Sequence, residues 1–130
     1  MLYLLIFVGA GLGGVFRQAV SAAVSKLLGM GFPFGTLTVN MVGSITMGAL
    51  AALFVLKAGV PQELKPFLTT GLLGGFTTFS TFSLDAVTLW QRGQTSEAIV
   101  YVGSSLALSM AGLVVGMMVV RWFLEQGAVA

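Results

Sequence analysis

The sequence predicts an all-α membrane protein with four transmembrane helices, the third of them broken. Of its 130 residues, 57% are hydrophobic and only 8% are charged, whereas soluble domains carry roughly a quarter charged residues. The apolar residues fall into four runs, each long enough to span a bilayer as a helix. We therefore expect a single transmembrane domain over residues 1–130, with spans at about 2–28, 34–56, 67–90 and 98–124.

The composition also excludes several classes of function. The chain has no Cys and no His, so it offers no thiol nucleophile, no disulfide and no imidazole base or metal ligand. Its six Lys and Arg residues are scattered along the chain and give a formal net charge of +2, which indicates no nucleic-acid surface. Because no nucleophile–base pair is present either, we expect no enzymatic activity.

In the first span, small and polar residues recur every four positions: Gly9, Gly13, Arg17, Ser21 and Ser25. Small residues at this spacing let helices approach closely, and we assign Gly9 and Gly13 to such packing. An arginine near the centre of a span costs at least ~2.5–3.5 kcal/mol, so it faces a cavity or a partner, or snorkels to the surface. Arg17 lies toward the helix end near Lys26, which leaves these interpretations open.

The second span repeats this spacing with Thr36, Asn40, Ser44 and Gly48. Asn40 lies about 10 Å beyond Pro33 if the helix rises 1.5 Å per residue. An amide in lipid needs partners. It makes either an interhelical hydrogen bond, typically worth about 0.6 kcal/mol, or serves as a donor in a pore, and the residue type leaves both open.

The third span contains the segment on which the rest of the chain depends, residues 71–85. Gly74 and Gly75 are poor residues for a helix interior, and the hydroxyls of Thr77 and Thr78 can bond back to carbonyls instead of continuing the helix. A break there would point main-chain groups inward, as discontinuous membrane helices do to hold ions. Such backbone persists in hydrocarbon only where protein buries it or it lines a cavity. We therefore predict an intramembrane site.

Beyond the predicted break, Phe79 and Phe82 share one helical face, and Ser80 and Ser83 occupy the adjacent one. Two phenyl rings on a helix usually indicate packing. Here they alternate with hydroxyls, and the partially positive edge of a phenyl ring can contact an anion without water. In the fourth span Tyr101, Ser105 and Ser109 recur every four residues and fit either a helix interface or a pore lining, while Gly112 and Gly116 indicate an interface.

The basic residues predict the topology of the assembly. With four spans, one side of the membrane carries Lys57, Lys65 and Arg121, and the other carries Lys26 and Arg92, with Arg17 if it snorkels. This balance selects no orientation. If both orientations insert, the natural assembly is an antiparallel homodimer with its two-fold axis in the membrane plane. Residues 74–77 of both copies would then bring carbonyl oxygens together on the axis, a site that suits Na⁺.

Three motifs resemble those of the small fluoride channels known as the Fluc or CrcB family. They are Gly11-x-x-Gly14-x-x-Arg17, Pro33-x-Gly35-Thr36-Leu37-x-Val39-Asn40 and Gly71-x-x-Gly74-Gly75-x-Thr77-Thr78-Phe79-Ser80-Thr81-Phe82-Ser83. The resemblance covers essentially the whole chain, and the third motif is highly specific. It implies a multi-pass protein of a prokaryotic plasma (inner) membrane, built as a dual-topology homodimer with two pores and a central structural sodium ion. The implied activity is passive fluoride efflux, which relieves fluoride toxicity.

The resemblance also implies roles for individual residues. Phe79 and Phe82 would meet fluoride edge-on, and the other pore-lining residues would be Asn40, Ser80, Thr81, Tyr101, Ser105 and Ser109. The carbonyls of Gly74 and Thr77 would bind Na⁺, and Arg17 would attract anions in an aqueous vestibule. We further hypothesise that Asp85 pairs with Arg17 at the same membrane face.

Two other functions compete with the fluoride channel. A dual-topology, proton-coupled exporter of small cationic drugs can be built from four helices of this size, but it needs a buried carboxylate. The other three spans contain none, which leaves Asp85 as the sole candidate. The second alternative is a structural subunit that transports nothing, in which the glycines serve packing alone.

Overall fold

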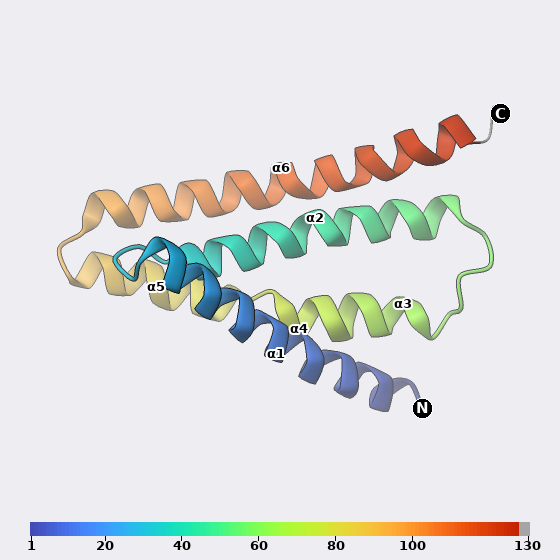
Figure 1. Ribbon diagram of the computed structural model, residues 1–130, viewed down its shortest axis with the longest axis horizontal. Coiled ribbons are helices and arrows are strands. Elements are labelled where there is room, and N and C mark those ends of the chain that lie inside the picture. Colours follow the sequence, from blue (N-terminus) through green and yellow to red (C-terminus); the bar gives the residue numbers. More distant parts are fainter. Residues whose placement is uncertain (128–130) are drawn as a thin grey trace.

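The computed structural model describes residues 1–127, and every regular element within that range is helical. The elements are α1 (Leu2–Leu28), α2 (Phe34–Leu56), the short α3 (Leu64–Pro66), the π-helical stretch η1 (Phe67–Leu73), α4 (Gly74–Phe76), α5 (Phe79–Gln91) and α6 (Thr95–Gly127). The chain crosses four times between the two ends of the molecule, so α1 begins at the same end at which α6 finishes (Figure 1). The third crossing comprises α3, η1, α4 and α5.

Within residues 1–127, three helices are long and apolar enough to cross a membrane: α1, α2 and α6. The bounds of α1 and α2 are those predicted from the sequence. Helix α6 begins at Thr95 and has 33 residues, which corresponds to about 50 Å at 1.5 Å per residue. Because the hydrocarbon core of a bilayer is about 30 Å thick, α6 extends beyond it.

The third crossing is broken, as the sequence predicts, but at the threonines and not at the glycines. Gly74 has helical backbone angles (φ −63°, ψ −36°). The extended residues are Thr77 (φ −77°, ψ 158°) and Thr78 (φ −151°, ψ 118°). A Cβ at Gly75 would overlap the carbonyl oxygen of Ala10 in α1. Gly75 therefore allows close helix packing, and the interruption has another cause.

Glycines allow two close helix contacts. On α1, a Cβ at Gly9 would lie 2.8 Å from the Phe67 carbonyl oxygen, and one at Gly13 would overlap that of Leu72. This confirms the packing role predicted for both glycines. Helices α2 and α6 interlock in the same way, because a Cβ at Gly48 would overlap the carbonyl oxygen of Leu113 in α6. Gly116 of α6 packs equally closely on α2. Close backbone contact thus holds α1 against the broken crossing and α2 against α6.

The buried apolar side chains are few, and four of them cluster near one end of the molecule. Phe82, Leu89, Ala98 and Tyr101 form a cluster between α5 and α6. Elsewhere large apolar side chains are exposed along the helices, among them Phe7, Val15, Phe16, Met110 and Met118. Soluble monomers rarely expose contiguous apolar surface on this scale. The distribution is that of a membrane protein whose outer surface contacts lipid.

Candidate functional site

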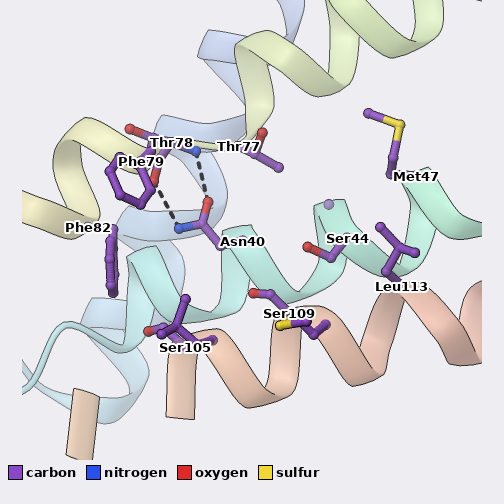
Figure 2. Close-up of a pocket in the computed structure, with 13 residues that line it drawn as sticks. Asn40, Ser44, Met47, Thr77, Thr78, Phe79, Phe82, Ser105, Ser109 and Leu113 are labelled. Carbon is purple, nitrogen blue, oxygen red and sulfur yellow. Dashed lines mark hydrogen bonds between the residues drawn. The ribbon is translucent and has the colours of Figure 1, made fainter. Parts of the chain in front are cut away.

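Asn40 of α2 holds the helix break in place. Its Nδ2 donates to the Thr78 carbonyl oxygen at 2.9 Å, and its Oδ1 accepts from the Thr78 amide at 2.8 Å (Figure 2). One side chain thus satisfies both main-chain polar groups of an extended residue in the membrane. A primary amide has two N–H donors, so one remains after the bond to Thr78. The interhelical bond is therefore present, and it leaves Asn40 one donor to offer.

The threonines end one helix and begin the next. The Thr77 hydroxyl and the Thr77 amide both donate to the Leu73 carbonyl oxygen at 2.9 Å. The Thr78 hydroxyl accepts from the Thr81 amide at 3.2 Å, as an N-cap residue does. The hydroxyls therefore compete with the helix for main-chain partners, which is how the sequence predicts the break.

The break also frees main-chain carbonyl groups, those of Gly74 and Thr77 among them. In a continuous helix the Gly74 carbonyl would accept from the Thr78 amide and the Thr77 carbonyl from the Thr81 amide. Here the Thr78 amide donates to Asn40 and the Thr81 amide donates to the Thr78 hydroxyl. Gly74 and Thr77 thus lose their helical partners. Among the described residues no group of three Asp or Glu side chains is placed to hold a metal ion, and main-chain oxygens are the groups at the break that could hold a hard cation.

A cavity of about 300 Å³, here called the Phe82 groove, runs beside the break between α2, α5 and α6. Its lining residues come from the break and from all three helices: Asn40, Gly43, Ser44, Met47, Thr77, Thr78, Phe79, Phe82, Ser105, Leu106, Ser109, Met110 and Leu113. Figure 2 shows how these side chains converge from separate elements. The groove therefore combines the amide of Asn40, several hydroxyls and two phenyl rings.

Three aromatic rings form a contact series along one side of this groove. The ring centroids of Phe79 and Phe82 lie 5.5 Å apart, and those of Phe82 and Tyr101 lie 5.4 Å apart. Phe82 is only 9% exposed, whereas Phe79 is 76% exposed. The phenyl ring of Phe82 therefore belongs to the interior of the protomer, and that of Phe79 faces outward.

Ser105 lines the groove but has a fully buried hydroxyl. Its side chain is 5% exposed, and its Oγ is buried without a hydrogen-bond partner among the residues that the structure describes. An unsatisfied buried polar group costs about 1–3 kcal/mol. The Ser105 hydroxyl is therefore an unsatisfied polar group enclosed within the protomer.

A second cavity of about 380 Å³, here called the Arg92 pocket, lies between α1, the loop after α1, the start of α2, and α5. Its lining residues are Ser21, Ser25, Met30, Gly31, Phe32, Pro33, Gly35, Thr36, Thr81, Asp85, Thr88, Leu89 and Arg92. It shares none of these with the Phe82 groove, but Thr81 and Phe82 are consecutive residues of α5. The two cavities therefore flank the first turn of α5.

The partners of Asp85 differ from those predicted. Its Oδ2 accepts from the Thr36 hydroxyl at 2.7 Å and from the Tyr101 hydroxyl at 3.2 Å, and it forms no salt bridge with Arg17 in the described part of the chain. The expected ion pair is therefore wrong. Two neutral hydroxyls from α2 and α6 bind the carboxylate because they face α5 at this depth. Arg17 is half-buried and lines neither cavity.

The structure brings together six of the residues to which the resemblance assigns a role. Those lining the Phe82 groove are Asn40, Thr77, Phe79, Phe82, Ser105 and Ser109. Thr81 lines the Arg92 pocket instead. Tyr101 is fully buried behind Phe82, the Ser80 hydroxyl lies 3.3 Å from that of Thr78, and Gly74 is exposed outside both cavities.

Sequence reasoning missed two residues of the Arg92 pocket, Thr88 and Arg92, and gave Thr36 no role beyond its place in a polar stripe. The sequence does contain a signal for them, which is the spacing of residues 81, 85, 88 and 92. Intervals of four, three and four residues put side chains on one helical face. Looking for that period in the third span would have found both.

These features define a class of protein: a small helical membrane protein in which a broken helix borders a cavity, the construction used where ions or solutes cross the bilayer. Comparison with known proteins then identifies the family. Residues 4–117 match the family described as CrcB-like protein, Camphor Resistance (CrcB), and the chain belongs to this family.

Similar proteins with high identity along almost their whole length come from several bacteria. The chain is 50% identical over 120 residues to a protein of Methylobacterium sp. (strain 4-46), with 92% of this chain and 96% of that protein covered. It is 46% identical over 121 residues to one of Rhodopseudomonas palustris (strain BisB5), with 93% and 98% covered. Both relatives are named fluoride-specific ion channel FluC. These names describe ion channels and not enzymes, and they place the family in bacterial membranes.

Removing the Asn40 amide is expected to destabilise the folded protein. In Asn40→Ala the amide and carbonyl of Thr78 lose their partners, at a cost of about 1–3 kcal/mol for each unsatisfied group. Thermal unfolding of the purified protein in detergent, followed by circular dichroism, measures the loss. Ser44→Ala, one helical turn away in the same groove, should unfold like the wild type. Equal stability of Asn40→Ala and the wild type would contradict this role.

Proposed function

We propose that this protein is a fluoride-selective channel for passive fluoride efflux across the bacterial inner membrane, which relieves fluoride toxicity. The observation that carries the proposal is the Phe82 groove, which brings together the spare amide hydrogen of Asn40, the side chain of Ser109 and the Phe82 ring. The names of the relatives supply the identity of the ion.

The groove has the chemistry that fluoride requires. A small, strongly hydrated anion crosses a membrane only if several close donors replace its water and none binds it too tightly to leave. Asn40 offers an N–H, Ser109 offers a hydroxyl, and the edge of Phe82 offers partial positive charge. No lining residue of the groove carries a full charge. Fluoride is thus solvated in the groove without being trapped.

The remaining polar residues extend this pathway. Ser80 and Thr81 continue the line of hydroxyls along the first turn of α5, and Thr81 reaches the Arg92 pocket. Tyr101 packs against Phe82 and donates its hydroxyl to Asp85. Its role is to fix the orientation of the Phe82 ring and the Asp85 carboxylate. Arg17 attracts anions from the aqueous vestibule.

The functional unit in this proposal is an antiparallel homodimer with two pores. In the protomer the Phe79 side chain is 76% exposed beside the groove. If its ring contacts fluoride, protein must enclose the ion on the exposed side as well. A second copy related by a two-fold axis in the membrane plane would supply that enclosure. Light scattering of the purified protein in detergent should give the mass of two chains, and a single-chain mass would contradict the dimer.

The dimer axis is also the proposed site of a structural Na⁺. The carbonyls of Gly74 and Thr77 have lost their helical partners, and Gly74 is exposed on the protomer, so both fit a cation shared between copies. When bound, Na⁺ supplies positive potential beside each pore without occupying it. Thermal unfolding should shift upward in Na⁺ relative to N-methylglucamine at equal ionic strength, and an unchanged midpoint would contradict the site.

Ion efflux from liposomes tests the proposed function directly. Vesicles containing the purified protein are loaded with fluoride or with chloride, and efflux is followed with ion-selective electrodes after a potassium ionophore is added to balance charge. We expect rapid loss of fluoride and retention of chloride. Protein-free vesicles are the control for leakage, and equal retention of both anions by a folded protein would contradict the proposal.

The same assay separates the channel from the proton-coupled exporter. The exporter requires Asp85 to exchange protons for substrate, whereas a channel moves fluoride down its gradient without a titrating group. Fluoride efflux through Asp85→Asn would therefore support the channel. Efflux that requires both Asp85 and a pH gradient would support coupled transport.

A further inference from the structure

The Arg92 pocket has a polar wall that the Phe82 groove does not explain. Thr81, Asp85 and Thr88 line it from a single face of α5, and Arg92, directly after the helix, continues the same spacing. Ser21 and Ser25 of α1 line the opposite side. The pocket lies at the end of the molecule where α1 joins α2 and where α5 ends (Figure 1). It is therefore a polar chamber at the membrane boundary, next to the helix turn that carries Phe82.

Arg92 is the only cationic residue in the lining of this pocket. It lies seven residues after Asp85, about 10 Å along a helix that rises 1.5 Å per residue. Among the described residues the two side chains form no ion pair. The Asp85 carboxylate instead accepts from the hydroxyls of Thr36 and Tyr101. The guanidinium charge of Arg92 is therefore available to an incoming anion.

The charge of Arg92 offsets negative potential that other groups create around the pocket. Arg92 is the C-cap of α5, and a helix C-terminus carries partial negative charge that repels anions. Asp85 adds a carboxylate deeper in the same pocket. Without Arg92, an anion at this mouth would face negative potential from both. The N-terminus of α2 at Gly35 and Thr36 contributes partial positive charge on the opposite side.

We propose that Arg92 is the residue that gathers anions at the mouth of the Arg92 pocket and delivers them toward Thr81 and the Phe82 groove. This role is additional to that of Arg17, which lies on another helix and lines neither cavity, and it rests on the proposed fluoride conduction. Arg92 acts through electrostatic attraction at the entrance. It raises the rate at which anions enter the pocket. The residues of the Phe82 groove determine which anion passes.

The test is the single-channel fluoride current in planar bilayers at a fixed, low fluoride concentration. A unit charge about 10 Å from an ion, at an effective dielectric constant between those of water and protein, changes its local concentration roughly two- to fourfold. Arg92→Gln should lower the current by about that factor, Arg92→Glu should lower it further, and Arg92→Lys should restore it. Raising the ionic strength to about 1 M with a bulky organic anion shortens the screening length to about 3 Å, so all variants should then approach the wild type.

The matched control is Lys26→Gln. Lys26 is an exposed cation near the end of α1 and lies outside the lining of the pocket, so removing it changes the net charge equally and should leave the current unchanged. An unchanged current in Arg92→Gln, with a wild-type unfolding midpoint, overturns the inference and leaves the fluoride channel standing. An equal fall in Lys26→Gln also overturns it, because the effect would then belong to overall charge. Absence of fluoride current in the wild type overturns the proposed function and, with it, this inference.

Discussion

Replacing Phe82 with isoleucine is expected to lower the fluoride current by up to about tenfold without unfolding the protein. The ring is buried between Phe79 and Tyr101 and faces the groove. Isoleucine keeps most of the buried apolar volume but has no electropositive edge. Losing an interaction of about 1.4 kcal/mol with the ion at its barrier corresponds to a tenfold lower rate, and quadrupole contacts are worth about 0.5–1.5 kcal/mol each.

The measurement is fluoride efflux from liposomes, with the unfolding midpoint determined on the same preparations. Phe54→Ile is the matched control, because Phe54 is a half-buried phenylalanine of α2 that lines neither cavity. It should conduct like the wild type. Efflux at the wild-type rate through Phe82→Ile would show that the Phe82 ring does not contact the conducted ion. An equal loss in Phe54→Ile would mean that efflux reports general packing and not contact with the ion.

The ends of the first two helices could be predicted because local chemistry determines them. Gly29 adopts a positive φ of 90° directly after α1, a conformation that glycine tolerates best. Pro33 precedes α2 as its N-cap. Both signals are readable without knowing what the helices contact. The long apolar runs between them set the helix lengths.

The location of the break within the third crossing depended on contacts that the sequence does not display. Both the glycine pair and the threonine pair are unfavourable in a helix interior, so local propensity could not rank them. Tertiary structure decided the outcome. Gly75 stays helical against Ala10 of α1, while Asn40 binds the main chain of Thr78. These contacts join residues far apart in the chain, and helical periodicity contains no information about them.

The same reasoning explains the outcome at Asp85. Residue spacing shows which side chains share a helix face, but not how each helix is rotated against its neighbours. The charges favoured Arg17 as the partner of Asp85, whereas the observed packing brings Thr36 and Tyr101 to it. By contrast, six residues selected from the sequence do meet in the Phe82 groove. Faces were predictable, and pairings between faces were not.

Adding one methyl group at Gly13 is expected to be the most damaging of the conservative substitutions in α1. A Cβ there would overlap the Leu72 carbonyl oxygen and would lie 2.8 Å from the Phe76 amide nitrogen and 3.0 Å from the Gly75 carbonyl carbon. All three are backbone atoms, so no side-chain rotation can relieve the overlap. Overpacking of this kind costs roughly 1–3 kcal/mol. Because the overlap is with backbone atoms, we expect the upper part of this range, of which the gain of about 1 kcal/mol from replacing glycine with alanine in a helix offsets only part.

Gly14→Ala provides the comparison because it makes the same chemical change one residue away. A Cβ at Gly14 meets nothing within 4 Å in the protomer, so helix propensity should leave this variant at least as stable as the wild type. Thermal unfolding in detergent should therefore show a lower midpoint for Gly13→Ala and no fall for Gly14→Ala.

Fluoride efflux should fall with Gly13→Ala as well, since α4 ends at the break that Asn40 and the threonines hold open. A wild-type midpoint for Gly13→Ala would mean that α1 does not pack this closely on α4 in the membrane. The break would then need a support other than the glycine face of α1.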